Sequence, residues 1–466
     1  MRSGAAKFTL PAILAFLVVA VTGSPARQDM SVIVQTPPMG WNSWDAWGYT
    51  INESQFRDSV TWFHNNLQRF SWQYVVIDEG WFAQHPENPA GHQDYTLSDD
   101  GLYLPAVNRF PSAAGGKGFR PLSDWVHSLG LKFGIHIVRG IPREAVSRNL
   151  GIAGSHFSAA DAADTTDTCE WNSDNYGLKN NKAAQAYYDS VADLYSKWGV
   201  DYLKVDCISR PWKADEIHMM RSALSQSGRP IVLSLSPGPT DFSHATEVAQ
   251  YAQMWRISND HWDGWTFPDA TSDEFPFGLQ GAFDRLAEWY IYASVGNWPD
   301  ADMLPEGWLG PHPGWGEARQ SRETQDEQRT EFTLWAVARS PLIFGGNLTR
   351  LDSFTRSILT NQMVLFVNQN AGYSHPVDVS TLGPGFENIR VWRATVAAPR
   401  ARGYAEFFAF FNLGSAPAAV HATWKDLGLD DRKYSAQSAW DNSTTKESKD
   451  ISFILPPHGS TLFQVR

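Results

Sequence analysis

The chain has 466 residues, of which 42% are hydrophobic and 19% charged, so its composition excludes a disordered protein and its length allows a large domain plus a smaller one. Its net charge of -12 and the lack of any long basic run argue against a nucleic-acid partner. Its 21 tryptophans, several beside polar turn residues, favour a mixture of core filling and stacking platforms for the apolar faces of sugars.

The first 26 residues have the pattern of a secretory signal peptide. Arg2 and Lys7 precede an apolar run over residues 10–21, and small residues follow over 22–26. The apolar run is shorter than the roughly 18 residues that cross a bilayer, and no later segment is long and apolar enough to do so. We therefore expect a cleaved signal peptide over 1–26 and a secreted or periplasmic protein, with an uncleaved anchor as the alternative.

Short apolar runs then alternate with amphipathic stretches. Strands are expected in the PPMGWNSW region and over residues 74–78, 131–138, 200–206, 230–236, 252–258, 296–304 and 340–346, with helices over 122–129, 183–198, 283–294 and 327–337. This alternation predicts a parallel sheet, and eight such units predict a (β/α)8 TIM barrel over residues 33–375. A doubly wound open sheet is the alternative, which is weakened because no strand is followed by a Gly-rich phosphate loop.

The pattern changes after residue 375. The segments ENIRVWRATV, AEFFAFFNL, KYSAQSAW and STLFQVR are β-like and are separated by polar turns. They predict a small C-terminal antiparallel β-sandwich over residues 376–466. We expect this domain to pack against the barrel, while an independent sugar-binding role stays open.

Cysteine usage is sparse, with only Cys169 and Cys207. In an exported protein an even number of cysteines favours a disulfide. Two thiols with no nearby histidine pair make a poor metal site, and a cysteine nucleophile would lack an obvious base.

The stretch YLKVDCIS raises the main chemical question, because Lys204 and Asp206 share one face of a predicted buried strand. A purely structural ion pair is the alternative to a functional one. In a barrel, reactive groups gather at the carboxyl ends of the strands. The polar residues at the expected strand ends are Asp78, Glu79, His136, Lys204, Asp206, Ser234, Ser236, Arg256, Asp260, Asp300 and Asp302.

This acidic set, with few cations and many tryptophans, is typical of a glycosidase. Hydrolysis with retention requires a nucleophilic carboxylate and an acid/base about 5–5.5 Å apart. Lys204 beside Asp206 would favour the ionised form that a nucleophile needs. Asp260, on the loop after its strand, is the candidate acid/base, which must be protonated when the substrate arrives.

Six motifs occur in order: PPMGWNSW, VVIDEGW, YLKVD, WRISND, NWPDADML and SPLIFGGNL. Together they resemble glycoside hydrolase family 27, the α-galactosidases and α-N-acetylgalactosaminidases, over residues 36–370. The resemblance implies a retaining exo-glycosidase with Asp206 as nucleophile and Asp260 as acid/base. It also implies that Lys204 and Arg256 bind sugar hydroxyls and that Trp44 forms an aromatic wall.

The same resemblance extends to the rest of the pocket. It implies that Asp78 and Glu79 bind the axial 4-OH and the 6-OH and that Asp302 is a further pocket acid. It also implies that Cys207 is bridged to the loop after the third strand, which carries Cys169 here. No metal or organic cofactor is implied.

Three departures from the family pattern bear on the substrate. Glu79 replaces the second of two aspartates and would fill the space of the galactose hydroxymethyl group, which favours L-arabinopyranose. Ser236 and Pro237 replace a common Glu-Trp, which would leave room for an N-acetyl group. His136 stands where tyrosine is common, and a long insertion follows through residue 176. The insertion would either shape the pocket rim or be a solvated loop.

We therefore expect a secreted exo-glycosidase that removes terminal α-D-galactosyl residues by double displacement. Its partner would be a carbohydrate with a terminal galactose-like sugar, and the oligomeric state stays open. A β-L-arabinopyranosidase or an α-N-acetylgalactosaminidase of the same family is the alternative. A non-catalytic carbohydrate-binding protein is the alternative from another class.

Overall fold

The computed structural model describes residues 33–86, 94–268, 274–380, 382, 383, 385–398 and 403–466. The predicted signal peptide over 1–26 therefore lies outside the described residues. Within them, no helix is long and apolar enough to cross a membrane.

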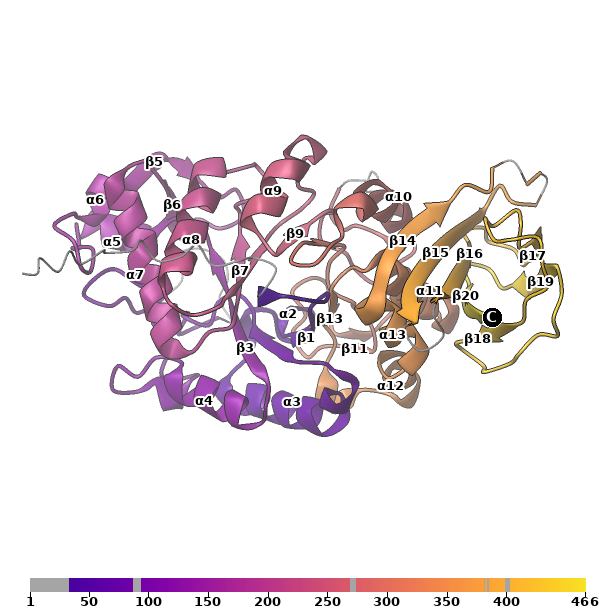
Figure 1. The fold of residues 1–466 in the computed structure, drawn as a ribbon. Helices are drawn as coiled ribbons and strands as arrows, with labels where there is room; N and C mark the ends of the chain where they lie inside the picture. Colours follow the sequence, from indigo (N-terminus) through magenta and orange to yellow (C-terminus); the bar gives the residue numbers. More distant parts are fainter. Residues whose placement is uncertain (1–32, 87–93, 269–273, 381, 384, 399–402) are drawn as a thin grey trace, which may run out of the picture.

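Eight parallel strands form one curled sheet in which every strand lies beside its neighbour in the chain (Figure 1). They are β1 (Met39–Asn42), β2 (Tyr74–Ile77), β3 (Lys132–Val138), β7 (Tyr202–Asp206), β8 (Val232–Leu235), β9 (Met254–Arg256), β10 (Trp298–Asp300) and β13 (Leu342–Phe344). A parallel bridge between Leu304, just past β10, and Phe344 on β13 joins the two ends of the sheet. The predicted (β/α)8 barrel is confirmed, and the open doubly wound sheet is excluded.

Helices connect the strands, as a parallel sheet requires. They are α3 (Glu53–Asn66), α4 (Arg120–Ser128), α7 (Lys182–Trp198), α8 (Ala214–Gln226), α9 (Ala245–Tyr251), α10 (Leu279–Trp289) and α11 (Gln325–Ala338), with α12 (Ser353–Leu359) and α13 (Gln362–Asn370) after β13. Asn52 and Asn181 cap α3 and α7 by accepting backbone N–H bonds, and Gly199 ends α7 in a left-handed conformation. The Gly199 cap ends α7 just before β7.

The insertion after β3 folds as a small substructure. It contains α5 (Arg143–Ser147), α6 (Ala159–Ala162) and an antiparallel sheet of β4 (Ile141–Pro142), β6 (Asn175–Leu178) and β5 (Ala163–Thr168) in that order. Arg139 ties this substructure to the barrel. Its guanidinium bonds Glu216 on α8 at 2.6 Å, Asp167 on β5 at 2.8 Å and the Cys207 carbonyl at 2.6 Å.

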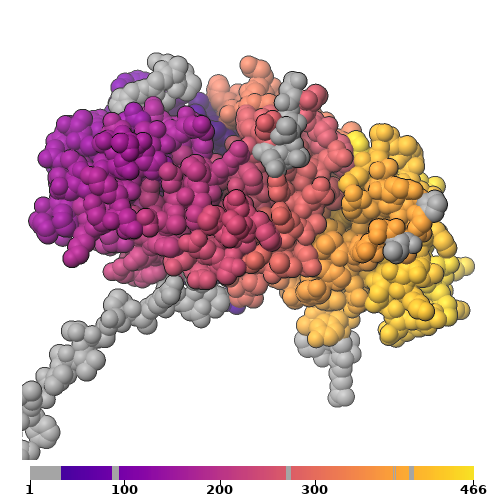
Figure 2. All heavy atoms as spheres, turned by 90° about the horizontal axis from the view of Figure 1, so that it is seen from above, coloured from indigo at the N-terminus to yellow at the C-terminus, as the bar shows by residue number. Residues whose placement is uncertain are grey.

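The C-terminal domain is an antiparallel sandwich at one end of the molecule (Figures 1 and 2). One layer has the order β14 (Ala371–Val377), β15 (Ile389–Ala398), β16 (Gly403–Asn412), β20 (Ser460–Val465) and β18 (Ala436–Ser438). The other pairs β17 (Ala418–Thr423) with β19 (Asp450–Leu455). The predicted sandwich is confirmed, while the division at residue 375, which falls within β14, stays a proposal.

The strand β16 shows why this domain packs against the barrel. Phe408 and Phe410 lie in the core between the two layers, whereas Phe407 and Phe411 belong to the core shared with the barrel. Both faces of β16 are therefore buried, which explains why the run FFAFF has no alternating polar residues.

Replacing the buried Arg139 by methionine should lower the free energy of unfolding by about 3–5 kcal/mol, because Glu216 would keep a buried charge without its partner. Urea denaturation checks this. The matched control is Arg148→Met, which breaks an exposed pair with Glu144 on α5 and should change stability by less than about 1 kcal/mol. Equal losses for the two variants would contradict the anchoring role of Arg139.

Candidate active site

A cavity of about 850 Å³ opens at the carboxyl ends of the barrel strands. Nine of the residues that the sequence predicted for the site line it: Trp44, Asp78, Glu79, Lys204, Asp206, Cys207, Ser236, Asp260 and Asp302. His136 and Arg256 lie just behind this lining and bond Asp206 and Asp302 respectively. Cys169 lies between two lining residues, Thr168 and Glu170.

Lys204 forms its ion pair with Asp78, at 3.0 Å, and not with Asp206 on its own strand. Lys204 lines the cavity, as its face of the strand predicted, but its direct partner comes from the end of β2. Asn42 also donates to the same Asp78 oxygen at 2.6 Å. Burial raises the pKa of Asp78, but Lys204, His136 and these hydrogen bonds outweigh it and hold the pKa well below its usual range.

Asp206 ends β7 and is kept ionised mainly by His136. Burial raises its pKa, but the hydrogen bond from His136 Nε2 at 3.3 Å, the charge of Lys204 and the Cys207 N–H at 2.7 Å bring the pKa below its ordinary value. A carboxylate that is ionised, partly accessible and held by several donors has the properties that a nucleophile needs.

Glu79 follows Asp78 in the chain, but its pKa shifts in the opposite direction. Its side chain is buried, Asn172 donates to Oε1 at 2.7 Å, and Tyr49 donates to Oε2 at 3.2 Å. Burial is the largest influence and raises the pKa of Glu79 to about 7, despite the lowering effect of His136. The pKa values of two acids that are adjacent in the chain therefore shift in opposite directions, because only Asp78 contacts Lys204.

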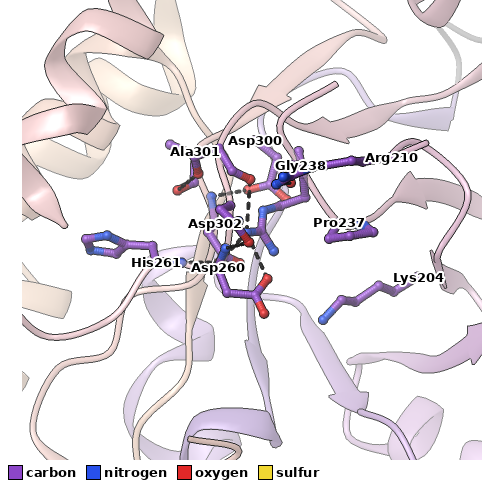
Figure 3. A network of polar contacts seen from close by, with 12 residues as sticks. Lys204, Arg210, Pro237, Gly238, Asp260, His261, Asp300, Ala301 and Asp302 are labelled. Carbon is purple, nitrogen blue, oxygen red and sulfur yellow. Dashed lines mark hydrogen bonds and ion pairs between the residues drawn. The ribbon is translucent and has the colours of Figure 1, made fainter. Parts of the chain in front are cut away.

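Asp260 follows β9 and lines the cavity, with Lys204 on the other side of the view in Figure 3. Arg256 Nη2 bonds Asp302 Oδ2 at 2.6 Å and Asp260 Oδ1 at 3.2 Å. The Asp260 side chain is 40% exposed and that of Asp206 14%, so Asp260 is the more accessible acid. This position suits a group that exchanges protons with a leaving group and with water.

The backbone is strained at two residues of the cavity. Cys207 has φ of 60° and Asp302 has φ of 90°, a region that non-glycine residues rarely adopt. Such a conformation costs of order 1–3 kcal/mol per residue and is found mainly at functional sites. The strain turns the chain sharply next to Asp206 and presents the Asp302 carboxylate to Arg256 and to the backbone N–H of His261.

The insertion after β3 forms part of the cavity rim. The Cys169–Cys207 disulfide joins it to the residue next to Asp206, and Thr168, Glu170 and Trp171 line the cavity. The interpretation of this segment as a solvated loop is therefore wrong for residues 168–172. Trp171 and Asn172 were not predicted from the sequence, although their position two and three residues after Cys169 would have been a usable signal.

Within the part of the chain that the structure describes, two groups of side chains have the spacing of metal ligands. One is Glu79, His136 and Asp206 in the cavity, and the other is His261, Glu323 and Glu331 in the core behind Asp260. In the second group His261 Nε2 lies 2.6 Å from Glu331 Oε1, which is a direct hydrogen bond. Two ligands of one tetrahedral zinc ion lie about 3.3 Å apart at bond lengths of about 2.0 Å, so this contact does not fit a shared ion.

The buried glutamates behind Asp260 are better described as a proton-sharing cluster. Burial raises the pKa of Glu306, Glu323 and Glu331 well above the usual range, and Glu331 shares hydrogen bonds with the other two. Hydrogen bonds between these carboxylic acids therefore take the place that ion pairs with Lys204 and Arg256 have in the cavity. The His261–Glu331 hydrogen bond links the cluster to the loop that carries Asp260. No motif in the sequence indicated this cluster.

Comparisons with known proteins agree with this geometry. Residues 176–370 match the family described as "Alpha galactosidase A", and residues 387–465 match "Alpha galactosidase C-terminal beta sandwich domain". The chain is 27% identical to alpha-galactosidase 2 of Arabidopsis thaliana over 92% of its own length and 89% of that protein. It is 28% identical to the alpha-galactosidase of Coffea arabica, over 92% and 93% of the two chains.

A solved structure is more similar still. The GH27 β-L-arabinopyranosidase of Geobacillus stearothermophilus is 40% identical, and the match covers 94% of this chain and 97% of that one with a TM-score of 0.85. The carboxyl groups at the barrel mouth, the matching C-terminal domain and this similarity agree with one another. The chain belongs to glycoside hydrolase family 27 and is a glycosidase that acts on the O-glycosyl bonds of carbohydrates.

Proposed function

We propose that the enzyme removes terminal β-L-arabinopyranosyl residues from carbohydrates with retention of configuration, and terminal α-D-galactosyl residues less efficiently. The observation that carries this proposal is the position of Glu79 in the cavity wall. The two sugars present the same ring hydroxyls, and L-arabinopyranose lacks only the hydroxymethyl group of galactose.

Glu79 cannot easily move aside for a larger sugar. It is 4% exposed, and both of its oxygens are held, one by Asn172 and the other by Tyr49. One oxygen also lies within 4.8 Å of the ligand atoms of both His136 and Asp206, so the carboxyl group reaches toward the predicted nucleophile. Glutamate is one methylene longer than aspartate, so it occupies space that a hydroxymethyl group would need. The similarity to the Geobacillus β-L-arabinopyranosidase supports the same substrate.

The α-D-galactosides are the second candidate substrates, because the curated relatives at 27–28% identity over 92% of this chain are named alpha-galactosidases. An N-acetylated sugar is a third choice, since the small Ser236 lines the cavity. These substrates share the catalytic groups, so a substrate panel separates them without any change in mechanism.

In the first step, an Asp206 oxygen forms a bond to the anomeric carbon while the bond from that carbon to the leaving oxygen breaks, and Asp260 gives its proton to that oxygen. In the second step, Asp260 takes a proton from water, the water oxygen bonds to the anomeric carbon, and the Asp206 carboxylate leaves. Lys204, Arg256 and Asp302 would hold sugar hydroxyls throughout.

We also propose that the protein is exported. The Cys169–Cys207 disulfide fits an oxidising compartment, as does the apolar N-terminal run over residues 10–21.

Asp206→Ala should lower kcat by about 10³-fold or more, because no covalent intermediate can form. Asp260→Ala should lower kcat/KM about 10²- to 10⁴-fold for a disaccharide and much less for a nitrophenyl glycoside, whose leaving group needs little protonation. Kinetics on both substrate types check this. The control is Asp124→Ala, an exposed acid on α4. Near-normal rates for Asp206→Ala would reject the assignment.

Glu79→Asp should shift the preference toward galactose, since the shorter side chain leaves room for the hydroxymethyl group. We expect the ratio of kcat/KM for nitrophenyl α-D-galactoside to that for nitrophenyl β-L-arabinopyranoside to rise by about ten-fold or more, on the order of 1.4 kcal/mol. The matched control is Glu170→Asp at the cavity rim, which should leave the ratio unchanged. An unchanged ratio in Glu79→Asp would remove the steric argument.

Glu79 also makes stability depend on pH. Its pKa is about 7 in the folded protein against 4.5 for an ordinary glutamate, so the folded state binds the proton more tightly. The resulting stabilisation is complete below pH 4.5 and is lost as the pH rises through about 7. Between about pH 5 and pH 8, the free energy of unfolding should therefore fall by about 2.5 kcal/mol more in the wild type than in Glu79→Gln. Urea denaturation at both pH values measures this difference, and parallel pH dependences would contradict it.

A further inference from the structure

We infer that the mouth of the cavity is a leaving-group subsite for a second pyranose ring, with the indole of Trp171 as its stacking platform. This inference rests on the proposed function and adds the chemical class of the group to which the terminal sugar is attached. It concerns two walls of the cavity that the catalytic steps do not use.

The first wall is residues 168–172, which are fixed at two points over the catalytic groups. The disulfide from Cys169 holds it to Cys207, beside Asp206. The Asn172 side chain holds it to Glu79 Oε1 at 2.7 Å. Trp171 lies between these two fixed points, so its backbone cannot move far from the sugar that Asp206 attacks.

The Trp171 side chain itself is free to receive a ligand. It lines the cavity and is 46% exposed. Among the residues that the structure describes, no aromatic ring or cation stacks on it. A large indole that is exposed on a firmly anchored segment is typical of a binding platform, because it offers apolar area at little entropic cost.

The second wall starts at the predicted acid/base. The Phe277 N–H donates to the Asp260 carbonyl at 2.8 Å, and the Trp262 N–H donates to the Phe277 carbonyl at 3.1 Å. Trp262 and Phe275 both line the cavity, and Phe275 is 46% exposed. The first wall is joined by the disulfide to the residue after Asp206, and the second wall begins two residues after Asp260. The leaving group must depart between these two acids, so it must lie in the space between the walls.

The second wall is also rigid. The Trp315 ring packs against Trp262 and Phe275, with centroids 5.4 Å and 5.8 Å away. The Arg319 guanidinium lies 5.3 Å from the Trp315 ring and bonds the buried Asp263 at 2.6 Å. A ligand at the mouth thus meets a wall that is already ordered, which lowers the entropic cost of binding.

Charged side chains at the mouth indicate a sugar rather than an alkyl or lipid group. Glu170 and Arg210 both line the cavity, and Arg210 donates to the Gly238 carbonyl at 3.2 Å, on the same side as Lys204 (Figure 3). A purely apolar group would remove these charges from water without replacing their hydrogen bonds. A pyranose ring offers both an apolar face for Trp171 and hydroxyl groups for Glu170 and Arg210. The volume of about 850 Å³ is also large for a single sugar.

The test compares two leaving groups on one terminal sugar. Glycosyl fluorides leave the mouth empty, whereas melibiose and β-L-arabinopyranosyl-arabinose fill it with a second ring. Trp171→Ala should lower kcat/KM for the disaccharides by about ten-fold, equivalent to about 1.4 kcal/mol, and change it less than two-fold for the matching fluorides. Trp171→Phe should recover most of the loss, and Tyr404→Ala, an exposed aromatic residue on β16, is the control with no effect.

Equal losses on fluorides and disaccharides would overturn the inference, because Trp171 would then only support the inner site. Unchanged rates on both would overturn it as well. If the wild type releases neither terminal sugar, the proposed function fails. The subsite is then tested separately, by measuring binding. In Asp206→Ala protein the disaccharide should bind about ten-fold more tightly than the free monosaccharide, and Trp171→Ala should abolish this difference. Equal affinities in Asp206→Ala would overturn the subsite.

Discussion

The burial of several carboxyl groups in one cavity is the constraint on which the site depends. Lys204 and Arg256 are buried cations of this cavity, and they form ion pairs with Asp78 and Asp302 respectively. Asp78 contacts Lys204 and stays charged, whereas burial raises the pKa of Asp300, two residues before Asp302, to about 7. The balance between burial and contact with a cation therefore sets the pKa of each acid.

The same constraint explains the structure behind Asp260. His261 and the glutamates near it have no arginine or lysine partner among the described residues, and they share hydrogen bonds instead. Carboxylic acids that share protons can be buried at a lower free-energy cost than carboxylates. Two contacts of His261 thereby hold the loop that carries Asp260. Glu331 bonds the His261 side chain, and Asp302 accepts from the His261 backbone N–H.

Features that depend on the local hydrophobic period or on the order of the strands could be predicted from the sequence. Alternation along YLKVD correctly predicted that Lys204 points into the cavity, and the order of the apolar runs predicted the barrel. The ion pair from Lys204 to Asp78 could not be read from the sequence, because it depends on the distance between two strands that are not neighbours, β2 and β7. The glutamate cluster was missed for the same reason, since Glu306 lies in a loop while Glu331 lies on α11.

In the proposed function, recognition of the terminal sugar and of its leaving group depends on different parts of the chain. Glu79, just past β2, faces the space beside the predicted nucleophile, whereas Trp171 belongs to the insertion after β3. Asn172 joins the two parts, because it follows Trp171 and donates to Glu79. On the side of the insertion, a change of leaving group at Trp171 can therefore reach the terminal sugar through this amide and the Cys169–Cys207 bridge. The insertion can accordingly vary at Trp171 without changing the inner cavity, provided that Cys169 and Asn172 are kept.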